Sequence, residues 1–181
     1  MENKKLETIV LGEGCFWCSE AVFSRLKGVE KVTSGYAGGH LADPTYEQVS
    51  AGGTGHAEVI KVDYDPEVIN VNQLLDVFFG THDPTTPNRQ GSDIGEQYRS
   101  IILYSTEDQK KEAEKYIAKL AEDKIFEKPI VTQIKPLGEF YKAEGYHARY
   151  YEGHAEEPYC RVVISPKLVK LRAKFSSLMK E

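Results

Sequence analysis

Two cysteines, Cys15 and Cys18, stand three residues apart in the segment GCFWCSE (14–20) and enclose Phe16 and Trp17. A strand-like run, LETIVLG (6–12), precedes them, and apolar residues at helical spacing follow. If the helix begins near Cys15, the unpaired N–H groups of its first turn should lower the pKa of this thiol. Cys15 is therefore a candidate nucleophile, and a half-buried packing cysteine is the alternative.

Two other functions use the same cysteines. A zinc-binding interaction module needs further close ligands, but Cys160 stands alone, and His147 and His154 are seven residues apart, an awkward spacing for chelation. A thiol–disulfide oxidoreductase with a thioredoxin-type dithiol also places its cysteines after a strand. The aromatic pair would be bulky, however, in a site that docks against many partner disulfides. Both functions remain alternatives, and the metal site is the less favoured.

An acid and two phenols extend the set of candidate residues. A strictly alternating strand begins at Glu58, and the residues that share its face are Ile60, Val62 and Tyr64. A carboxyl on that apolar side would lose hydration, so its pKa would rise and it could act as an acid; a strand-end glutamate in water is the alternative. Tyr46 and Tyr98 lie in or beside two long polar loops. Together these groups suggest an apolar pocket around a small polar oxygen.

The elements that must position these residues follow from the periodicity of the sequence. Strands are predicted at 6–12, 29–36, 58–64, 99–105 and 130–135, and helices at 15–27, 71–80, 107–122 and 165–180. Ser105 with Asp108 resembles a capping box, and Ser165 with Pro166 resembles a helix start. The core order of strand, helix, strand, strand, helix, strand predicts an α+β, ferredoxin-like split-βαβ two-layer sandwich with a C-terminal helix. Two loops of about twenty residues are long for this core and are functional candidates.

Length and composition limit the possible functions. The chain has 181 residues, 40% of them hydrophobic and 28% charged, and we expect a single domain over 1–181. A net charge of −5 does not favour binding to nucleic acid or anionic membranes. No apolar run approaches the roughly 20 residues needed to span a bilayer. The N-terminus shows no signal-peptide pattern, so we expect a cytoplasmic protein, in which three cysteines favour redox, catalytic or metal-binding roles.

Five blocks of sequence, in the same order, resemble peptide methionine sulfoxide reductase of type A. They are GCFWCSE (14–20), PTYEQV (44–49), GHAEVI (55–60), QGSDIGEQYRS (90–100) and AEGYH (143–147). The resemblance implies a ferredoxin-like core with long active-site loops and reduction of the S epimer of methionine sulfoxide, free or in proteins. It also implies thioredoxin as the usual reductant and no metal or organic cofactor. We further expect a monomer that binds neither nucleic acid nor membranes.

The resemblance also implies roles for the candidate residues. Cys15 matches the nucleophile, which attacks the sulfoxide sulfur and is left as a sulfenic acid. Phe16 and Trp17 match the walls that receive the S-methyl group, and Glu58 matches the acid that protonates the oxygen. The other polar positions of the pocket, two phenols that hydrogen-bond the oxygen and one acidic residue, are Tyr46, Tyr98 and Asp93.

The thiol that resolves the sulfenic acid is left open. On a helix, Cys18 would have its Cα atom on the order of 5 Å from that of Cys15, but a disulfide across the first turn closes a tight ring. Cys160 ends the segment YYEGHAEEPYC, which could swing toward Cys15, and it resembles a recycling cysteine of some members of the family. The alternative is that Cys160 is a packing cysteine at the start of the strand-like run CRVVI. Many members carry glycine in place of Cys18, and the chain lacks the glycine-rich, cysteine-bearing tail of others. We favour Cys160, with Cys18 as the alternative or as a relay.

Overall fold

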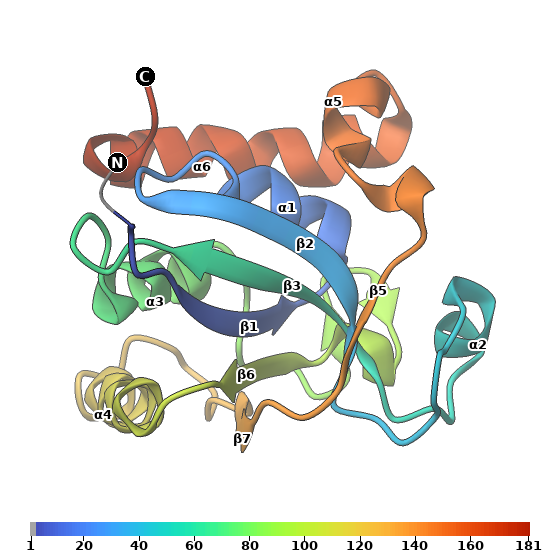
Figure 1. Cartoon of the computed structure of the whole chain (residues 1–181), viewed down its shortest axis with the longest axis horizontal. Coiled ribbons are helices and arrows are strands. Elements are labelled where there is room, and N and C mark those ends of the chain that lie inside the picture. The colour runs from blue at the N-terminus through green and yellow to red at the C-terminus, as the bar shows by residue number, and fades with distance from the viewer. Residues whose placement is uncertain (1–2) are drawn as a thin grey trace.

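The computed structural model describes residues 3–181 and is built on one six-stranded sheet in the order β7-β6-β1-β3-β2-β8 (Figure 1). The strands are β1 Glu7–Glu13, β2 Val29–Ala37, β3 Ala57–Tyr64, β6 Ser100–Tyr104, β7 Gln133–Pro136 and β8 Phe140–Lys142. β6 and β7 pair in parallel, and the other neighbours are antiparallel. The inner order β6-β1-β3-β2 confirms the predicted ferredoxin-like split-βαβ arrangement.

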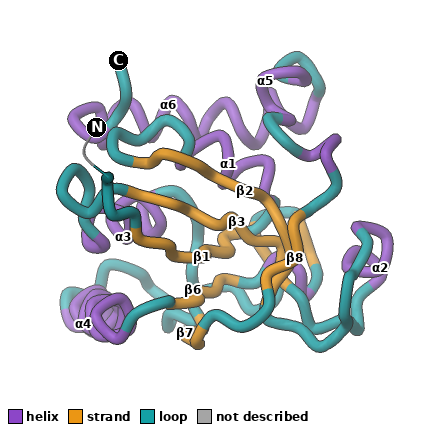
Figure 2. Tube along the Cα trace, in the orientation of Figure 1, coloured by secondary structure: helices purple, strands orange, loops and turns teal. Residues whose placement is uncertain are grey.

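Four longer helices pack against this sheet and against one another (Figures 1 and 2). They are α1 Phe16–Phe23, α3 Val71–Gly80, α4 Glu107–Glu122 and α6 Ser165–Phe175. α6 packs on α1 and α3, while α4 packs on α3, β6 and β7. Ile9 and Leu11 of β1 belong to the main core between the sheet and the helices. Val10, between them, points to the other face, where Leu137 and Phe140 cover a smaller apolar cluster.

The turn from β1 into α1 is tight because glycines allow it. Gly14 has a φ of 105°, a left-handed conformation that side chains rarely adopt. A Cβ atom on Gly12 would lie 2.7 Å from Cγ2 of Ile101, so β1 approaches β6 closely only with glycine there. Cys15 follows directly as the N-cap residue of α1. The nucleophile candidate is thus held on a short, constrained connection.

The two long polar loops carry short elements of their own. The first contains α2 (Tyr46–Ala51), which begins with a capping box between Thr45 and Gln48. The second contains the hairpin of β4 (Arg89–Gln90) and β5 (Asp93–Ile94), followed by a 3₁₀ turn, η1 (Glu96–Tyr98). Figure 1 shows α2 of the first loop and β5 of the second at the same end of the sheet, away from α4. They therefore bring their tyrosines and Asp93 to one end of the molecule.

Most predicted elements lie where the structure has them, and the helices at 71–80 and 107–122 match their observed bounds. The predicted cap of α4 is wrong by one residue. Its N-cap is Thr106, whose side chain accepts the N–H of Gln109 in a reciprocal capping box, in place of the predicted pair Ser105–Asp108. Thr106 is the cap because the side-chain amide of Gln109, at position N3, can also accept a hydrogen bond from the backbone N–H of the cap residue.

The prediction of a strand at CRVVI is also wrong. Cys160–Ile164 forms a π-helix that runs directly into α6, so Ser165 continues a helix and does not cap one. Cys160 and Ile164, four residues apart, are buried, whereas Val162 is 74% exposed. That pattern has helical spacing and no strand alternation. The helical segment therefore begins with the π-helix, before Ser165, and α6 ends at Phe175, before the predicted end at 180.

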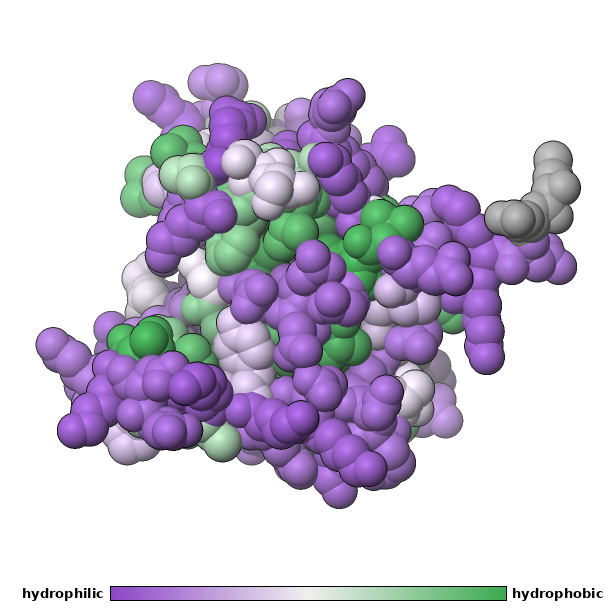
Figure 3. All heavy atoms as spheres, turned by 90° about the vertical axis from the view of Figure 1, so that its left-hand side faces the viewer, coloured by the Kyte–Doolittle hydropathy of each residue, from purple (hydrophilic) through white to green (hydrophobic). Residues whose placement is uncertain are grey.

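The surface on the α4 side is mostly hydrophilic. Figure 3 shows this face, with hydrophobic atoms visible between charged and polar side chains. Throughout residues 3–181, no helix has the length and apolar character that crossing a membrane requires.

Candidate active site

Cys15 lies at the N-terminus of α1, where its carbonyl accepts the N–H groups of Cys18 at 3.1 Å and Ser19 at 3.4 Å. Its side chain is buried, with 9% of the residue exposed. Burial raises the pKa of the Cys15 thiol well above its ordinary value, and a hydrogen bond with Cys18 and the nearby Glu58 carboxyl raise it further. The predicted lowering of this pKa is therefore wrong, because lost hydration outweighs the field of the helix.

Of the two thiols Cys15 and Cys18, Cys18 has the lower pKa. The hydrogen bond with the Cys15 thiol lowers the pKa of Cys18 to about 7, and the positive charge of Lys167 acts in the same direction. Its Sγ also lies 3.7 Å from the hydroxyl of Tyr159. The two thiols thus act as one acid, in which a proton on Cys15 stabilises a thiolate on Cys18.

Glu58 lies at the start of β3 and is 2% exposed, so the alternation of this strand correctly placed it on the buried face. Its Oε1 accepts the backbone N–H of Phe16 at 3.2 Å. Its Oε2 is buried and has no hydrogen-bond partner among the described residues. Burial raises the pKa of Glu58 to about 8, so near neutral pH the carboxyl is largely protonated and can donate to an incoming oxygen.

Tyr46 and Tyr98 come from the two long loops and are half-buried beside this carboxyl. Burial raises the pKa of each phenol, and the charges of Glu58 and Cys15 are the next causes for both, which places the four groups close together. The backbone N–H of Tyr46 donates to Glu144 Oε2 at 2.9 Å, which ties α2 to the segment after β8. Both phenols therefore remain neutral hydrogen-bond donors.

An aromatic wall stands beside the thiols. Trp17 stacks on Tyr150 with ring centroids 3.7 Å apart and an interplanar angle of 6°. Its indole N–H donates to Nδ1 of His147 at 3.0 Å. Phe16 is fully buried, and its ring centroid lies 4.9 Å from that of His147. One face and the polar edge of the indole are thus occupied, which fixes the orientation of the wall.

Asp93 is connected to the thiol pair through Tyr159. Its Oδ2 accepts the hydroxyl proton of Tyr159 at 2.7 Å, and Tyr159 lies against Cys18. The negative charge of Asp93 also raises the pKa of Glu58. Asp93 therefore belongs to the site both through this contact chain and through its field.

Cys160 is fully buried in the π-helix beside α1. Burial raises the pKa of its thiol, and the charges of Glu157 and Cys18 raise it further. The preceding segment is held in place, because the N–H of Arg149 donates to Glu20 Oε1 at 2.7 Å. All three cysteines are free thiols, and within residues 3–181 no three histidine, cysteine or acidic side chains are grouped to hold a metal ion.

Three residues of this site were missed from the sequence. They are His147, Tyr150 and Tyr159. His147 was weighed only as a metal ligand, and the two tyrosines lie in the segment expected to swing. The motif AEGYH (143–147) carried a signal for His147. No local pattern marks the two tyrosines, because Trp17 and Cys18, which they contact in the site, lie more than 100 residues away in the chain.

Comparisons with known proteins agree with this geometry. The family model described as peptide methionine sulfoxide reductase matches residues 7–179. The peptide methionine sulfoxide reductase MsrA of Acinetobacter baumannii (strain AYE) is 55% identical over 175 residues, covering 97% of this chain and 99% of that protein. The solved methionine sulfoxide reductase A of Corynebacterium diphtheriae is 35% identical with a TM-score of 0.74, covering 84% of this chain and 76% of that one. Mxr1 of Saccharomyces cerevisiae, solved in complex with Trx2, is 26% identical with a TM-score of 0.51, covering 82% and 87%. The chain belongs to the type A peptide methionine sulfoxide reductases, enzymes that reduce methionine sulfoxide.

Proposed function

We propose that the site around Cys15 reduces the S epimer of methionine sulfoxide, free or in proteins. The observation that carries this assignment is the free Oε2 of Glu58, a buried and largely protonated carboxyl beside two neutral phenols and a thiol pair. A sulfoxide oxygen is the small polar acceptor that such a set of donors fits. The alternatives of a general disulfide oxidoreductase and a zinc module use neither the acid nor the phenols.

In the first step Glu58 activates the oxygen. Its O–H donates a proton to the sulfoxide oxygen, while Tyr46 and Tyr98 donate hydrogen bonds to it. Phe16 and the open face of Trp17 receive the S-methyl group. A protonated sulfoxide has an electrophilic sulfur, so the residues around the oxygen determine whether a thiol can attack.

In the second step Cys15 attacks that sulfur, and its proton passes to the Cys18 thiolate to which it is hydrogen-bonded. A bond forms between the Cys15 sulfur and the methionine sulfur. The hydroxyl group then moves from the methionine sulfur to the Cys15 sulfur as this sulfur–sulfur bond breaks, so Cys15 is left as a sulfenic acid and methionine leaves as the thioether. Cys18 then attacks the sulfenic sulfur. The new disulfide forms as the hydroxyl group leaves with a proton as water, which balances one sulfoxide against two thiols.

The order of the resolving thiols follows from their contacts. The hydrogen bond between the Cys15 and Cys18 thiols supports Cys18 as the first partner, although the sequence favours Cys160. Cys160 lies near Cys18 on a helix packed against α1, which supports a second exchange from Cys18 to Cys160. In this order Cys18 is the relay, and Cys160 presents the disulfide to the reductant after a local rearrangement.

The reductant is assigned as thioredoxin, supported by the complex of Mxr1 with Trx2. A dithiol that is regenerated in this way fits a reducing compartment, which supports a cytoplasmic location. The residues of the site come from loops, helices and strands that pack around the same six-stranded sheet, which supports a single domain over residues 1–181, and we propose that the protein acts as a monomer.

The deciding experiment incubates the protein with each methionine sulfoxide epimer and a dithiol and measures methionine release. We expect release from the S epimer alone, and none above background from Cys15→Ser, because a hydroxyl is a far weaker nucleophile than a thiolate. Turnover by Cys15→Ser, or equal turnover of the two epimers, would contradict the proposal. For the resolving thiol, one equivalent of substrate followed by digestion without reductant should give a Cys15–Cys18 peptide in Cys160→Ser. A Cys15–Cys160 peptide as the first product in wild type would reverse the order.

A further inference from the structure

A groove of about 680 Å³ adjoins the active site. It lies between β2 and the segment that leaves β8 toward α5 (Tyr150–His154), and Figure 1 shows this segment diverging from β2. At the site end it is lined by Trp17, Glu144 and His147. The same Trp17 forms the wall beside Cys15, so a chain lying in the groove can place one side chain in the site. We call this feature the β2-edge groove.

One wall of the β2-edge groove is an open strand edge. The β2–β8 ladder ends where the N–H of Ala143 donates to the carbonyl of Ser34 at 2.9 Å. In an antiparallel ladder alternate residues direct both backbone groups to the same side, so Val32 directs its N–H and C=O as Ser34 does, into the groove. Neither group of Val32 has a hydrogen-bond partner on that side among the described residues. An extended chain can pair with this edge.

A second unsatisfied group lies at the site end. Nδ1 of His147 accepts the Trp17 indole N–H, so in the neutral ring the proton is on Nε2. His147 is fully buried, and its Nε2 has no hydrogen-bond partner among the described residues. A buried donor without an acceptor is costly. A carbonyl oxygen of a chain entering the groove would satisfy it.

The charges that face the groove are mainly positive. Its basic lining residues are Arg25, Lys31, Lys142, Arg149 and Lys180. None of them belongs to an ion pair formed within residues 3–181. Of the four acidic lining residues, Glu30 is already paired with Lys4, and burial raises the pKa of Glu20, which leaves the charges of Glu144 and Glu152 against five cations. In a chain of net charge −5, this concentration of unpaired cations favours an acidic ligand.

We propose that the β2-edge groove binds the residues that flank an oxidised methionine, as an extended and acidic polypeptide segment. Its main chain pairs with Val32, one of its carbonyls accepts from His147, and its carboxylates lie near Lys31 and Lys142. The inference rests on the proposed function, because the oxidised methionine must react at Cys15. It gives this reductase a preference for oxidised methionines in extended, acidic sequences.

The test compares two short peptides that carry the same central methionine sulfoxide, one flanked by glutamates and one by lysines, with free methionine sulfoxide as a third substrate. We expect kcat/KM for the acidic peptide to exceed that of the basic one by about tenfold at low salt, and high salt to reduce the difference. Lys31→Glu should remove most of this preference without changing turnover of free methionine sulfoxide. Lys31 is exposed, so the substitution leaves the core intact.

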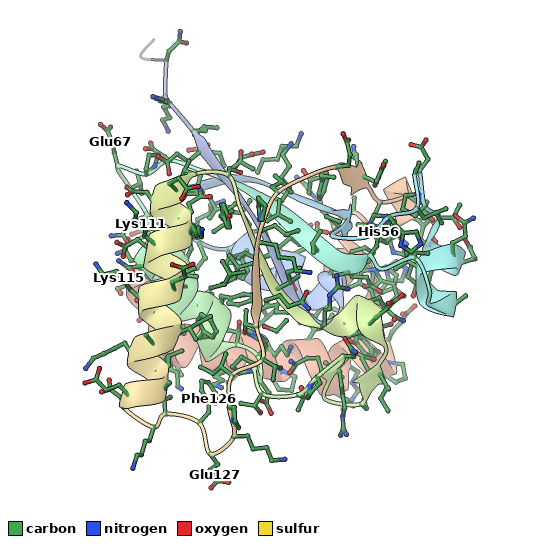
Figure 4. All side chains as sticks on the ribbon, turned by 90° about the horizontal axis from the view of Figure 1, so that it is seen from below. His56, Glu67, Lys111, Lys115, Phe126 and Glu127 are labelled. Carbon is green, nitrogen blue, oxygen red and sulfur yellow. The ribbon has the colours of Figure 1, made fainter. Side chains whose placement is uncertain are left out.

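Lys111→Glu is the matched control. Lys111 lies exposed on α4, and Figure 4 shows it on the opposite side of the molecule from His56, which precedes the site residue Glu58 by two positions. Equal kcat/KM for the two peptides, or equal effects of Lys31→Glu and Lys111→Glu, would overturn the groove assignment while turnover of free methionine sulfoxide stood. If wild type did not turn over free methionine sulfoxide at all, that result would instead overturn the proposed function and this inference with it.

Discussion

Replacing Glu58 with glutamine separates two effects of a buried acid. The amide keeps the shape of the side chain and can still accept the N–H of Phe16, but it cannot donate a proton to the substrate oxygen. We expect the reductive step to slow by roughly 10²-fold or more, the low end for a lost general acid. We also expect the variant to be more stable than wild type at neutral pH.

The size of the stability change follows from the pKa. In the folded protein burial raises the pKa of Glu58 from 4.5 to about 8, so between these values the folded state binds more protons than the unfolded state. The stability of wild type therefore falls as the pH rises through this window, while glutamine does not titrate. The difference between the two proteins should grow by about 1.4 kcal/mol per pH unit and be on the order of 3 kcal/mol at pH 7.

The assay is urea unfolding of both proteins at several pH values between about pH 5 and pH 8, with single-turnover reduction measured on the same samples. Glu139→Gln is the control, because Glu139 is exposed and lies outside the site. Parallel stability curves for wild type and Glu58→Gln would refute the reasoning, since Glu58 would then ionise like a solvated carboxyl. An unchanged single-turnover rate would show that the phenols activate the oxygen without the acid.

Three further substitutions test the site and the turn that holds it. Cys18→Ser should let the sulfenic acid accumulate on Cys15 after one turnover, detected by trapping with dimedone and mass spectrometry; no trapped adduct would argue against Cys18 as the first resolving thiol. Tyr150→Ala removes the ring stacked 3.7 Å from Trp17 and should raise KM by about two- to tenfold in steady-state kinetics, whereas an unchanged KM would mean that the indole keeps its position alone. Gly14→Ala places a side chain at a φ of 105° and should lower the free energy of unfolding by about 1–3 kcal/mol in urea; a neutral result would mean that the turn relaxes.

Local sequence patterns account for much of the fold. Helices at 71–80 and 107–122 were predicted with their observed bounds, because their apolar spacing and polar flanks are properties of neighbouring residues. The burial of Glu58 followed from the alternation of β3, since side chains two apart in a strand face the same way. The strand prediction for residues 160–164 was wrong because a run of five residues is compatible with a strand or a helix, and the contacts with the rest of the fold determine which one forms.

By itself, the sequence predicted the core order, the burial of Glu58 and Cys15 as the candidate nucleophile, all of which depend on residue type and short spacing, while it left the resolving thiol open between Cys18 and Cys160. Only the tertiary structure decided how these groups ionise and what surrounds them. The pKa of Cys15 rises because β3 and the aromatic wall exclude water from it, and neither contact can be read from a helix start. The stacking of Tyr150 on Trp17 and the contact of Tyr159 with Cys18 likewise join segments more than 100 residues apart. Solvation and electrostatic fields depend on distance in space, so the chemistry of the thiol pair was settled only when the chain folded.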